Sequence, residues 1–548
     1  MKKIIFCITM LLPTLLMAND IIPKYEVRAV WLTTIGGIDW PHSYANKYDE
    51  YSIQRQKKEF TEILDVLKAA NINTILLQTR IRATTIYPSN IEPWDGAFSG
   101  KPGVSPGYDP LEFAVEECHK RGMEVHAWVV TIPVGKWNSY GCKQLRKRYP
   151  NIIKNIKGEG YMNPESYKTG DYLSKLCGEI AEKYDIDGIH LDYIRYPETW
   201  KGYVNGYEAR QNITAIVKQI YNTVKQKHSW IKVSCSPIGK YDDLRLYSSH
   251  GWNAYTRVYQ DAQGWLRDGI MDQLYPMMYF RNKNFFPFAV DWKENSYGKT
   301  IAGGLGIYMM DRHEGNWSLS DINRELTLLR HLGMGQCFFR AHHLKSNIKG
   351  CYDLLCDEIN KYPSLIPPMK WENRKSPDAP TLLTIKDRDK GCDISWKNMG
   401  KNIHYNIYAS SENGIDINDA KNLLITRYYN TEVTIPSVYR SIAITSTDRY
   451  GNESAPAIIK EKSIDETIPT ENNTYIRCDG FSIKVPYNNI NSADILLIKS
   501  MQGQILYVRK NQRIILVNDI PNGVYRLYSV RKKKFEHFLG QFEIKRDK

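Results

Sequence analysis

Short apolar runs alternate with amphipathic segments between residues 26 and 360 of the chain. The intervening segments place apolar side chains at helical spacing, as at Leu173, Leu176 and Ile180. Eight such alternations predict a (β/α)8 (TIM) barrel over residues 24–365 rather than an open doubly wound sheet. The runs that predict its strands are 26–33, 73–79, 124–130, 187–192, 231–236, 272–279, 301–308 and 335–340.

The loops that follow the first three predicted strands are much longer than the returns from helix to strand. They cover 34–52, 80–109 and 131–163 and are rich in Pro, Gly, Trp and Tyr. Barrel enzymes build their active sites on the loops at the carboxyl ends of the strands. The asymmetry therefore predicts a functional rim at that end. No Gly-rich phosphate-binding motif follows any predicted strand, which disfavours a nucleotide-binding fold.

The pattern changes after residue 365. Prolines around 366–368 and 377–380 indicate a linker, and short alternating strands follow. We expect one or two all-β sandwich domains, at 378–463 and 468–548. The segment Thr447–Ser454 resembles the end of a fibronectin type III domain. The predicted fold class is thus α/β, a TIM barrel followed by all-β sandwich domains.

The N-terminus predicts export. Lys2 and Lys3 precede an apolar run from Ile4 to Met17, and Ala18 offers a small-residue cleavage point. This is typical of a secretory signal peptide over residues 1–18. No other stretch is long enough to cross a bilayer, so we expect no transmembrane segment after cleavage and a location in the periplasm, at the cell surface or outside the cell.

Charge and cysteine content narrow the class of partner. Signal cleavage removes two lysines and lowers the formal net charge from +14 to +12. A basic surface of this kind favours acidic glycans, a cell-wall polymer or simply solubility, whereas export argues against nucleic acid. Nine cysteines remain, an odd number without a CxxC pair. We therefore expect mostly buried free thiols, no metal site and no cofactor, although Cys351 and Cys356 could form a bridge.

The strongest chemical signal is the segment 187–197, which reads DGIHLDYIRYP. Side chains alternate along a strand, so Gly188, His190 and Asp192 face the barrel axis while Ile189 and Leu191 face the helices. Asp192 then stands at the carboxyl end of the fourth strand. A carboxylate there can attack an anomeric carbon, stabilise an oxocarbenium-like transition state or donate a proton. The alternative is a loop cap or a pair with Arg195.

Further candidates come from neighbouring strands and loops. Inward parity on strands two and three predicts that several polar side chains meet near Asp192. We expect a second carboxylate in the long loop around Trp94, ahead of the other rim acids Asp39, Glu198, Asp242, Asp311 and Glu314. The substrate-binding candidates are Gln78, Arg80, Trp94, His126, Trp128, Arg195, Tyr196 and Tyr279, and the additional catalytic candidates are Glu92 and Asp95.

Residues 26 to about 360 resemble the glycosyl-hydrolase-like 10 family. The resemblance rests on a series of motifs in order, namely Arg28–Trp31, Asp39–Pro41, Tyr87–Ser89, Tyr108–Leu111, His126–Trp128, Asp187–His190 and Ser236–Pro237. It implies a (β/α)8 fold, an envelope or secreted location and hydrolysis of glycosidic bonds. Some members are thought to cut peptide-stripped peptidoglycan glycan strands. The chain departs from the family pattern at Thr84, Tyr193 and Met277, where relatives carry Asp, Asp and Gln.

These observations leave three hypotheses. The first is an exported glycoside hydrolase that cleaves a polysaccharide, with peptide-stripped peptidoglycan as a candidate substrate. The second, motivated by the departures at Thr84, Tyr193 and Met277, is a non-catalytic glycan-binding protein on a decayed barrel. The third is a surface adhesion protein whose terminal β-domains are the working part.

Overall fold

The computed structural model describes most of the barrel and of the β-rich region. The predicted signal peptide 1–18 lies outside the described residues, as does the start of the segment 468–548. The described residues are 21–201, 204–388, 391–412, 414–436, 438–459, 476, 478, 482–485, 495–501, 504–510, 514–517, 520–531 and 535–546.

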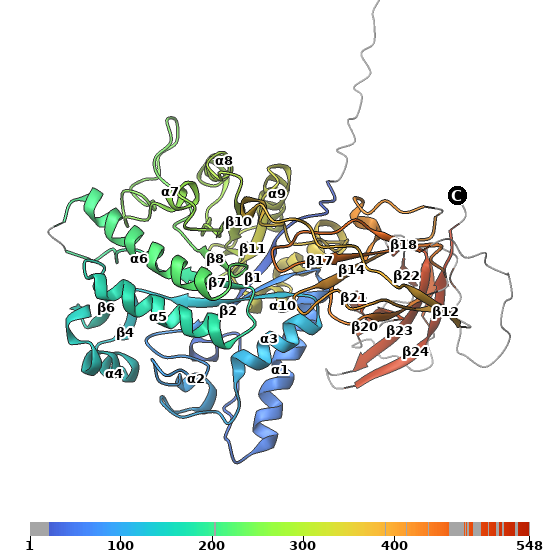
Figure 1. Ribbon diagram of the computed structural model, residues 1–548, viewed down its shortest axis with the longest axis horizontal. Helices are drawn as coiled ribbons and strands as arrows, with labels where there is room; N and C mark the ends of the chain where they lie inside the picture. The colour runs from blue at the N-terminus through green and yellow to red at the C-terminus, as the bar shows by residue number, and fades with distance from the viewer. Residues whose placement is uncertain are drawn as a thin grey trace, which may run out of the picture.

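Eight parallel strands close into a barrel, which confirms the predicted fold class (Figure 1). Each of the eight barrel strands overlaps a predicted strand, and the barrel strands are buried. The sixth is the shortest because only two of its residues pair continuously. The strands are β1 (Arg28–Leu32), β2 (Thr74–Arg80), β3 (Glu124–Val130), β7 (Gly188–Asp192), β8 (Lys232–Cys235), β9 (Gln273–Leu274), β10 (Thr300–Leu305) and β11 (Gly335–Phe338).

Amphipathic helices cover the barrel. In α5 the buried stripe contains Leu173, Leu176 and Ile180, as the helical spacing predicts. Carboxylates cap α1 and α3, where Asp49 and Asp109 accept hydrogen bonds from first-turn N–H groups. The helices of the barrel are α1 (Glu50–Ala69), α3 (Pro110–Lys120), α5 (Tyr167–Lys183), α6 (Gly206–Lys227), α7 (Ala262–Arg267), α8 (Phe286–Glu294), α9 (Leu319–His331), α10 (Ala341–Lys345) and α11 (Cys351–Leu354).

The long loops at the carboxyl ends of the strands carry structure of their own. The loop after β2 contains the short helix α2 (Gly96–Ser99). The loop after β3 contains α4 (Tyr140–Arg148) and a three-stranded antiparallel sheet, β4 (Pro133–Lys136), β6 (Glu159–Met162) and β5 (Ile153–Ile156). Figure 1 shows α4, β4 and β6 at the end of the barrel away from the C-terminal β-strands.

The C-terminal third is all-β, as predicted. A three-stranded sheet, β12 (Thr384–Arg388), β13 (Gly391–Ser395) and β16 (Glu432–Pro436), shares a core with a four-stranded sheet. In spatial order the latter contains β15 (Leu423–Tyr428), β14 (His404–Ser410), β17 (Ser441–Thr447) and β18 (Ala457–Ile459).

A second all-β unit with its own apolar core ends the chain. It pairs β19 (Ser482–Lys484) with β22 (Ile514–Leu516). It also contains a four-stranded sheet in the order β21 (Ile505–Lys510), β20 (Ile495–Ser500), β23 (Gly523–Arg531) and β24 (Phe535–Ile544).

The first β-unit packs on the amino-terminal end of the barrel. Arg427 of β15 pairs with Glu124 at the start of β3 (Nη1–Oε1 2.9 Å) and with Asp187 just before β7 (Nη2–Oδ1 2.8 Å). Arg449 adds contacts to Asp185 and Asp187. The β-unit therefore covers the end of the barrel opposite the long loops (Figure 1).

All nine cysteines of the described residues are free thiols, and all but Cys356 and Cys478 are buried. The suggested bridge between Cys351 and Cys356 is therefore wrong. Cys351 is buried in the helical layer of the barrel core, and the Cys356 thiol contacts the Ala69 carbonyl instead. Within the described part of the chain, no helix combines the length and apolarity needed to span a bilayer.

Candidate active site

A cavity of about 520 Å³ lies at the carboxyl ends of the barrel strands. Its walls come from the ends of β1, β2, β3 and β7 and from the small sheet of the β3 loop. The lining residues include Thr33, Gln78, Arg82, Trp128, Glu159, Tyr161, Asp192, Tyr193, Arg195, Glu198, Met277, Tyr279, Phe339 and Arg340.

Asp192 occupies the floor of this cavity and is held by three donors. Its Oδ1 accepts hydrogen bonds from the Ser236 hydroxyl (2.8 Å) and the Tyr193 N–H (2.8 Å). Its Oδ2 accepts one from the Trp128 indole N–H (3.0 Å). The carboxylate is 6% exposed, so its orientation is fixed before any substrate arrives.

Burial and hydrogen bonding act in opposite directions on Asp192. Burial raises the pKa of this carboxyl, while the hydrogen bonds from Ser236 and Trp128 lower it. Burial dominates, and the pKa of Asp192 lies above its ordinary value. A carboxyl group in this condition is suited to exchanging a proton or accepting positive charge.

Tyr193 follows Asp192 in a strained backbone conformation. Its φ of 52° lies in the left-handed region, which is an outlier for a bulky residue. This turn directs the Tyr193 N–H back to the Asp192 carboxylate. The Tyr193 ring is 42% exposed, lines the cavity and stacks against the Arg195 guanidinium at 4.6 Å. Strain of this kind concentrates at functional sites.

Gln78 and Trp128 lie in the same cavity as Asp192, as inward parity predicts. The Gln78 side-chain carbonyl accepts hydrogen bonds from the N–H groups of Thr34 (3.0 Å) and Ile35 (2.9 Å). Gln78 therefore fixes the first rim loop. Tyr279 and Arg195 also line the cavity, and Arg195 pairs with Glu198 at 2.9 Å.

Arg80 and Glu92 do not reach the cavity. A β-bulge shifts the register between Gln78 and Arg80, so that Arg80 lies opposite Val129 on the outer face of the barrel. There Arg80 forms a fully buried bidentate pair with Glu92 (Nη2–Oε1 2.7 Å), and the Tyr172 hydroxyl donates to the same carboxylate (2.9 Å). The expected placement of Arg80 beside Asp192 is thus wrong, because strict alternation fails at the bulge.

Four further candidates lie outside the residues that line the cavity. The imidazole of His126 points inward but contacts Glu124 at the opposite end of β3 (3.2 Å). Tyr196 is buried and accepts a hydrogen bond from Asn212 (3.1 Å). Asp95 caps α2 and accepts a hydrogen bond from Thr84 (2.6 Å), while the half-buried Trp94 belongs to the same loop.

Other cavity residues escaped the sequence analysis. Glu159 and Tyr161 come from β6, which is only four residues long and lies within the predicted loop 131–163. Arg340 forms an ion pair with Asp39, whose carboxylate also accepts hydrogen bonds from Thr33. The lengths of the loops predict a functional rim at this end of the barrel, but not which of its residues line the cavity.

Comparisons with known proteins identify relatives of this chain. The family model described as Glycosyl hydrolase-like 10 matches residues 26–210 and 206–308, more than half of the chain. Glycosyl hydrolase YngK of Bacillus subtilis is 27% identical over 78% of this chain and 92% of its own length. Glycosyl hydrolase DigH of Escherichia coli K12 is 30% identical over 46% of this chain and 65% of its own length.

Among solved structures, the glycoside hydrolase domain of PgaB (BpsB) from Bordetella bronchiseptica aligns with 61% of this chain and 99% of its own. Its TM-score is 0.42 and its sequence identity is 11%. By sequence and fold, the protein is a glycoside hydrolase built on a (β/α)8 barrel. Within that class, the chain belongs to the Glycosyl hydrolase-like 10 family.

Proposed function

We propose that the protein is an exported enzyme that cleaves glycosidic bonds within a polysaccharide, with Asp192 as its catalytic carboxylate. The observation that carries the proposal is the buried Asp192 carboxylate, held by three donors on the floor of the cavity. A sugar ring bound above it would place its anomeric carbon next to a preorganised negative charge. Such an arrangement stabilises an oxocarbenium-like transition state.

We assign the second carboxylate to Glu159 rather than to Glu92 or Asp95. Glu92 is tied to Arg80, and Asp95 serves as a helix cap. Glu159 lines the same cavity as Asp192 and has no hydrogen bond or ion pair through its side chain within the described residues. Glu198 also lines the cavity, but Arg195 neutralises it. A carboxyl without an ion-pair partner can take up and release a proton without breaking an ion pair, which suits the acid–base role.

The charges around the cavity favour an acidic glycan. Arg82 lines the rim, is exposed and lacks a carboxylate partner among the described residues. It is therefore available to a substrate carboxylate, such as the lactyl group of peptidoglycan glycan strands. Peptide-stripped peptidoglycan is accordingly our first candidate substrate.

Export and the β-domains complete the proposal. The charged start, apolar run and small residue of positions 1–18 support export to the periplasm or cell surface. The order of the two sheets between Thr384 and Ile459 supports a fibronectin type III-like module. Because this module is docked on the barrel base, we assign it a structural role rather than that of a flexible spacer.

The experiment is to incubate the mature protein with a panel of envelope and plant polysaccharides, including peptide-stripped peptidoglycan, and to analyse products by mass spectrometry. New oligosaccharides from peptidoglycan strands are the expected result. Products from a neutral polymer alone would contradict the acidic substrate. Binding of the polymers without products would favour a glycan-binding protein instead.

A further inference from the structure

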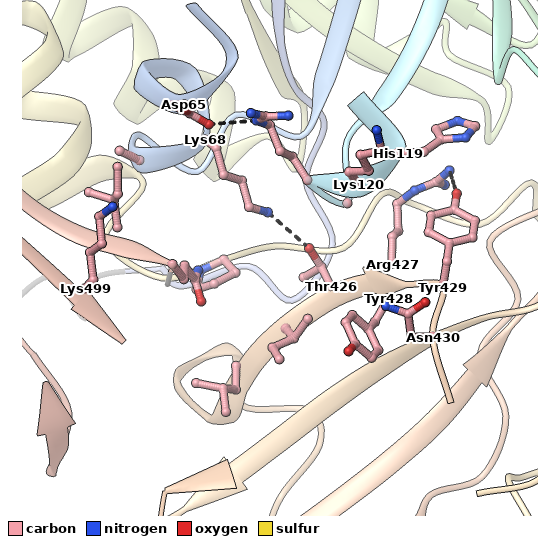
Figure 2. A pocket seen from close by; sticks show the side chains of 18 of the residues that line it. Asp65, Lys68, His119, Lys120, Thr426, Arg427, Tyr428, Tyr429, Asn430 and Lys499 are labelled. Carbon is pink, nitrogen blue, oxygen red and sulfur yellow. Dashed lines mark hydrogen bonds and ion pairs between the residues drawn. The ribbon is translucent and has the colours of Figure 1, made fainter. Parts of the chain in front are cut away.

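A second hollow lies at the opposite end of the barrel from the catalytic cavity. It encloses about 690 Å³ between the barrel and both β-units (Figure 2). One wall is formed by the C-terminal ends of α1 and α3, and the facing wall by β15. Lys499 of β20 and Gln504, next to β21, close one side. We call this hollow the interdomain groove.

Cations outnumber anions along the interdomain groove. The basic side chains that line it are Lys68, Lys120, Arg121, Arg427 and Lys499, and the acidic ones are Asp65 and Glu116. Several of these charges are compensated. Arg121 pairs with Asp65 (2.8 Å) and with Glu117 (2.6 Å), and Lys120 pairs with Glu117 (2.7 Å).

Lys68 differs from its neighbours because it has no carboxylate partner among the described residues. Lys68 donates a long hydrogen bond, 3.5 Å from Nζ to the Thr426 hydroxyl. Figure 2 shows Lys68 extending from α1 across the groove toward Thr426. Burial, followed by the positive charge of Arg427, lowers the pKa of Lys68 to about 8. The side chain is still mainly an ammonium at neutral pH, held in a half-buried position without a counter-ion.

Arg427 places a second cation close to Lys68. Its two Nη atoms bind Glu124 and Asp187, which lie in the barrel base, while its Nε–H has no acceptor among the described residues. Arg427 also adopts a left-handed backbone, with φ of 51°. A half-buried ammonium next to a second cation is costly unless an anion accompanies it. The groove therefore has the electrostatic character of an anion site.

We propose that the interdomain groove is a second, non-catalytic binding site for a carboxylate-bearing saccharide, whose carboxylate contacts the Lys68 ammonium and the Thr426 hydroxyl. The volume suits two or three sugar rings and is much larger than a lone inorganic anion needs. Polar groups for sugar hydroxyls are supplied by Tyr429, Asn430 and Gln504. The choice of a saccharide rests on the proposed function, whereas the anion site itself rests on Lys68.

The site would hold an acidic polymer at a distance from the catalytic cavity. Because its walls belong to different domains, ligand binding there also favours the docked arrangement of the β-units. Such a site would keep the enzyme on its polymer between cleavage events, since each additional contact raises the effective concentration of the chain.

The test is hydrogen-exchange mass spectrometry on the full-length mature protein carrying Asp192→Asn, so that bound saccharide is not consumed. The probes are a muramic-acid-containing tetrasaccharide, the same saccharide with its carboxylates reduced to alcohols, and inorganic phosphate. The acidic tetrasaccharide is expected to protect peptides covering 65–70 and 423–430, and the reduced one is not. Lys68→Met should weaken this protection, measured as apparent Kd, by about tenfold or more.

Lys58→Met is the matched control, because Lys58 lies exposed on the same helix and outside the groove. It should leave the protection unchanged. Equal protection in Lys68→Met and Lys58→Met would overturn the proposal, as would protection by phosphate alone at the same affinity. Peptides covering 188–196 report the catalytic cavity separately, so failure of the proposed function and failure of the groove are distinguishable.

Discussion

The Arg427 guanidinium of the first β-unit donates a hydrogen bond to the Asp187 carboxylate of the barrel, with an Nη2–Oδ1 distance of 2.8 Å. Asp187 lies five residues before Asp192, at the other end of the same strand. Burial acts to raise the pKa of Asp187, but the charges of Arg427 and His119 hold that pKa well below its ordinary range. The β-unit thus adds a cation to two buried carboxylates, Glu124 and Asp187, that the barrel pairs with Lys232 and His119.

Arg427→Met is expected to destabilise the whole protein. Removing one partner of a buried ion pair costs up to about 3–5 kcal/mol. The cost here is reduced because Glu124 and Asp187 lose one cation each and keep Lys232 and His119. Thermal unfolding should show a lower melting temperature than that of the wild type. Arg388→Met is the control, since Arg388 pairs with Asp393 on the surface and should contribute less than about 1 kcal/mol. Equal melting temperatures for the two variants would refute a stabilising role for the Arg427 ion pairs.

Glu325 provides a test of stability against pH. Its carboxyl is 1% exposed and neither oxygen has a hydrogen-bond partner among the described residues. Burial, followed by the charge of Asp321, raises the pKa of Glu325 to about 9. A carboxyl whose folded pKa exceeds its unfolded value favours the folded state only where it is protonated in both states. Its contribution to stability therefore falls as pH rises from about 4.5 to about 9.

Glu325→Gln should raise the melting temperature at pH 7 by several degrees and leave it nearly unchanged at pH 4. The amide keeps the shape of the side chain but cannot ionise in the unfolded state. Differential scanning calorimetry at the two pH values measures the effect. A larger stabilisation at pH 4 than at pH 7 would contradict the assignment of a neutral buried carboxyl.

Tyr193→Gly tests whether Tyr193 serves substrate binding or only the stability of the fold. Glycine adopts the left-handed backbone without strain, so the free energy of unfolding should stay level or rise by about 1 kcal/mol. The cavity loses its exposed ring, so kcat/KM should fall about tenfold or more. Tyr193→Phe keeps the ring and the strain and should retain most activity. If Tyr193→Gly loses stability while keeping its kcat/KM, the ring has no role in substrate binding.

Glu159→Gln tests the assignment of the second carboxylate. General acid–base catalysis contributes about 10²–10⁴-fold, so kcat should fall by at least two orders of magnitude without loss of fold. Glu198 lines the same cavity, so Glu198→Gln is the matched control, and its kcat should fall by less than about tenfold. Initial rates on the identified polymer provide the measurement. The reverse order of losses would assign the acid–base role to Glu198.

Strand parity predicted the core of the site and failed at identifiable places. Trp128 and Asp192 met as expected because β3 and β7 are regular and pair in register. Arg80 does not face the cavity, because the β-bulge after Gln78 reverses the alternation of inward and outward side chains. A bulge leaves no clear mark in the sequence, since the residue inserted in the strand, Thr79, is an ordinary strand former.

Other features depended on contacts that local sequence patterns do not contain. Glu159 was missed because β6 is too short to show a period. One partner of Asp187 is Arg427, 240 residues away, and only the docking of the β-unit brings them together. Glu92 was predicted as a site residue from its place in a rim loop. Its carboxylate instead pairs with Arg80 on the outer face of the barrel, because the buried Arg80 guanidinium needs a counter-charge.

The most direct test of the central claim is the kcat of Asp192→Asn on the polysaccharide that the wild type cleaves, measured with its melting temperature. Asparagine keeps the size of the side chain but lacks the negative charge. If Asp192 is the catalytic carboxylate, kcat should fall by at least about 10³-fold in a folded protein. Asp95→Asn is the control, because asparagine also caps helices, and it should retain activity. A folded Asp192→Asn with wild-type turnover would remove Asp192 from the mechanism.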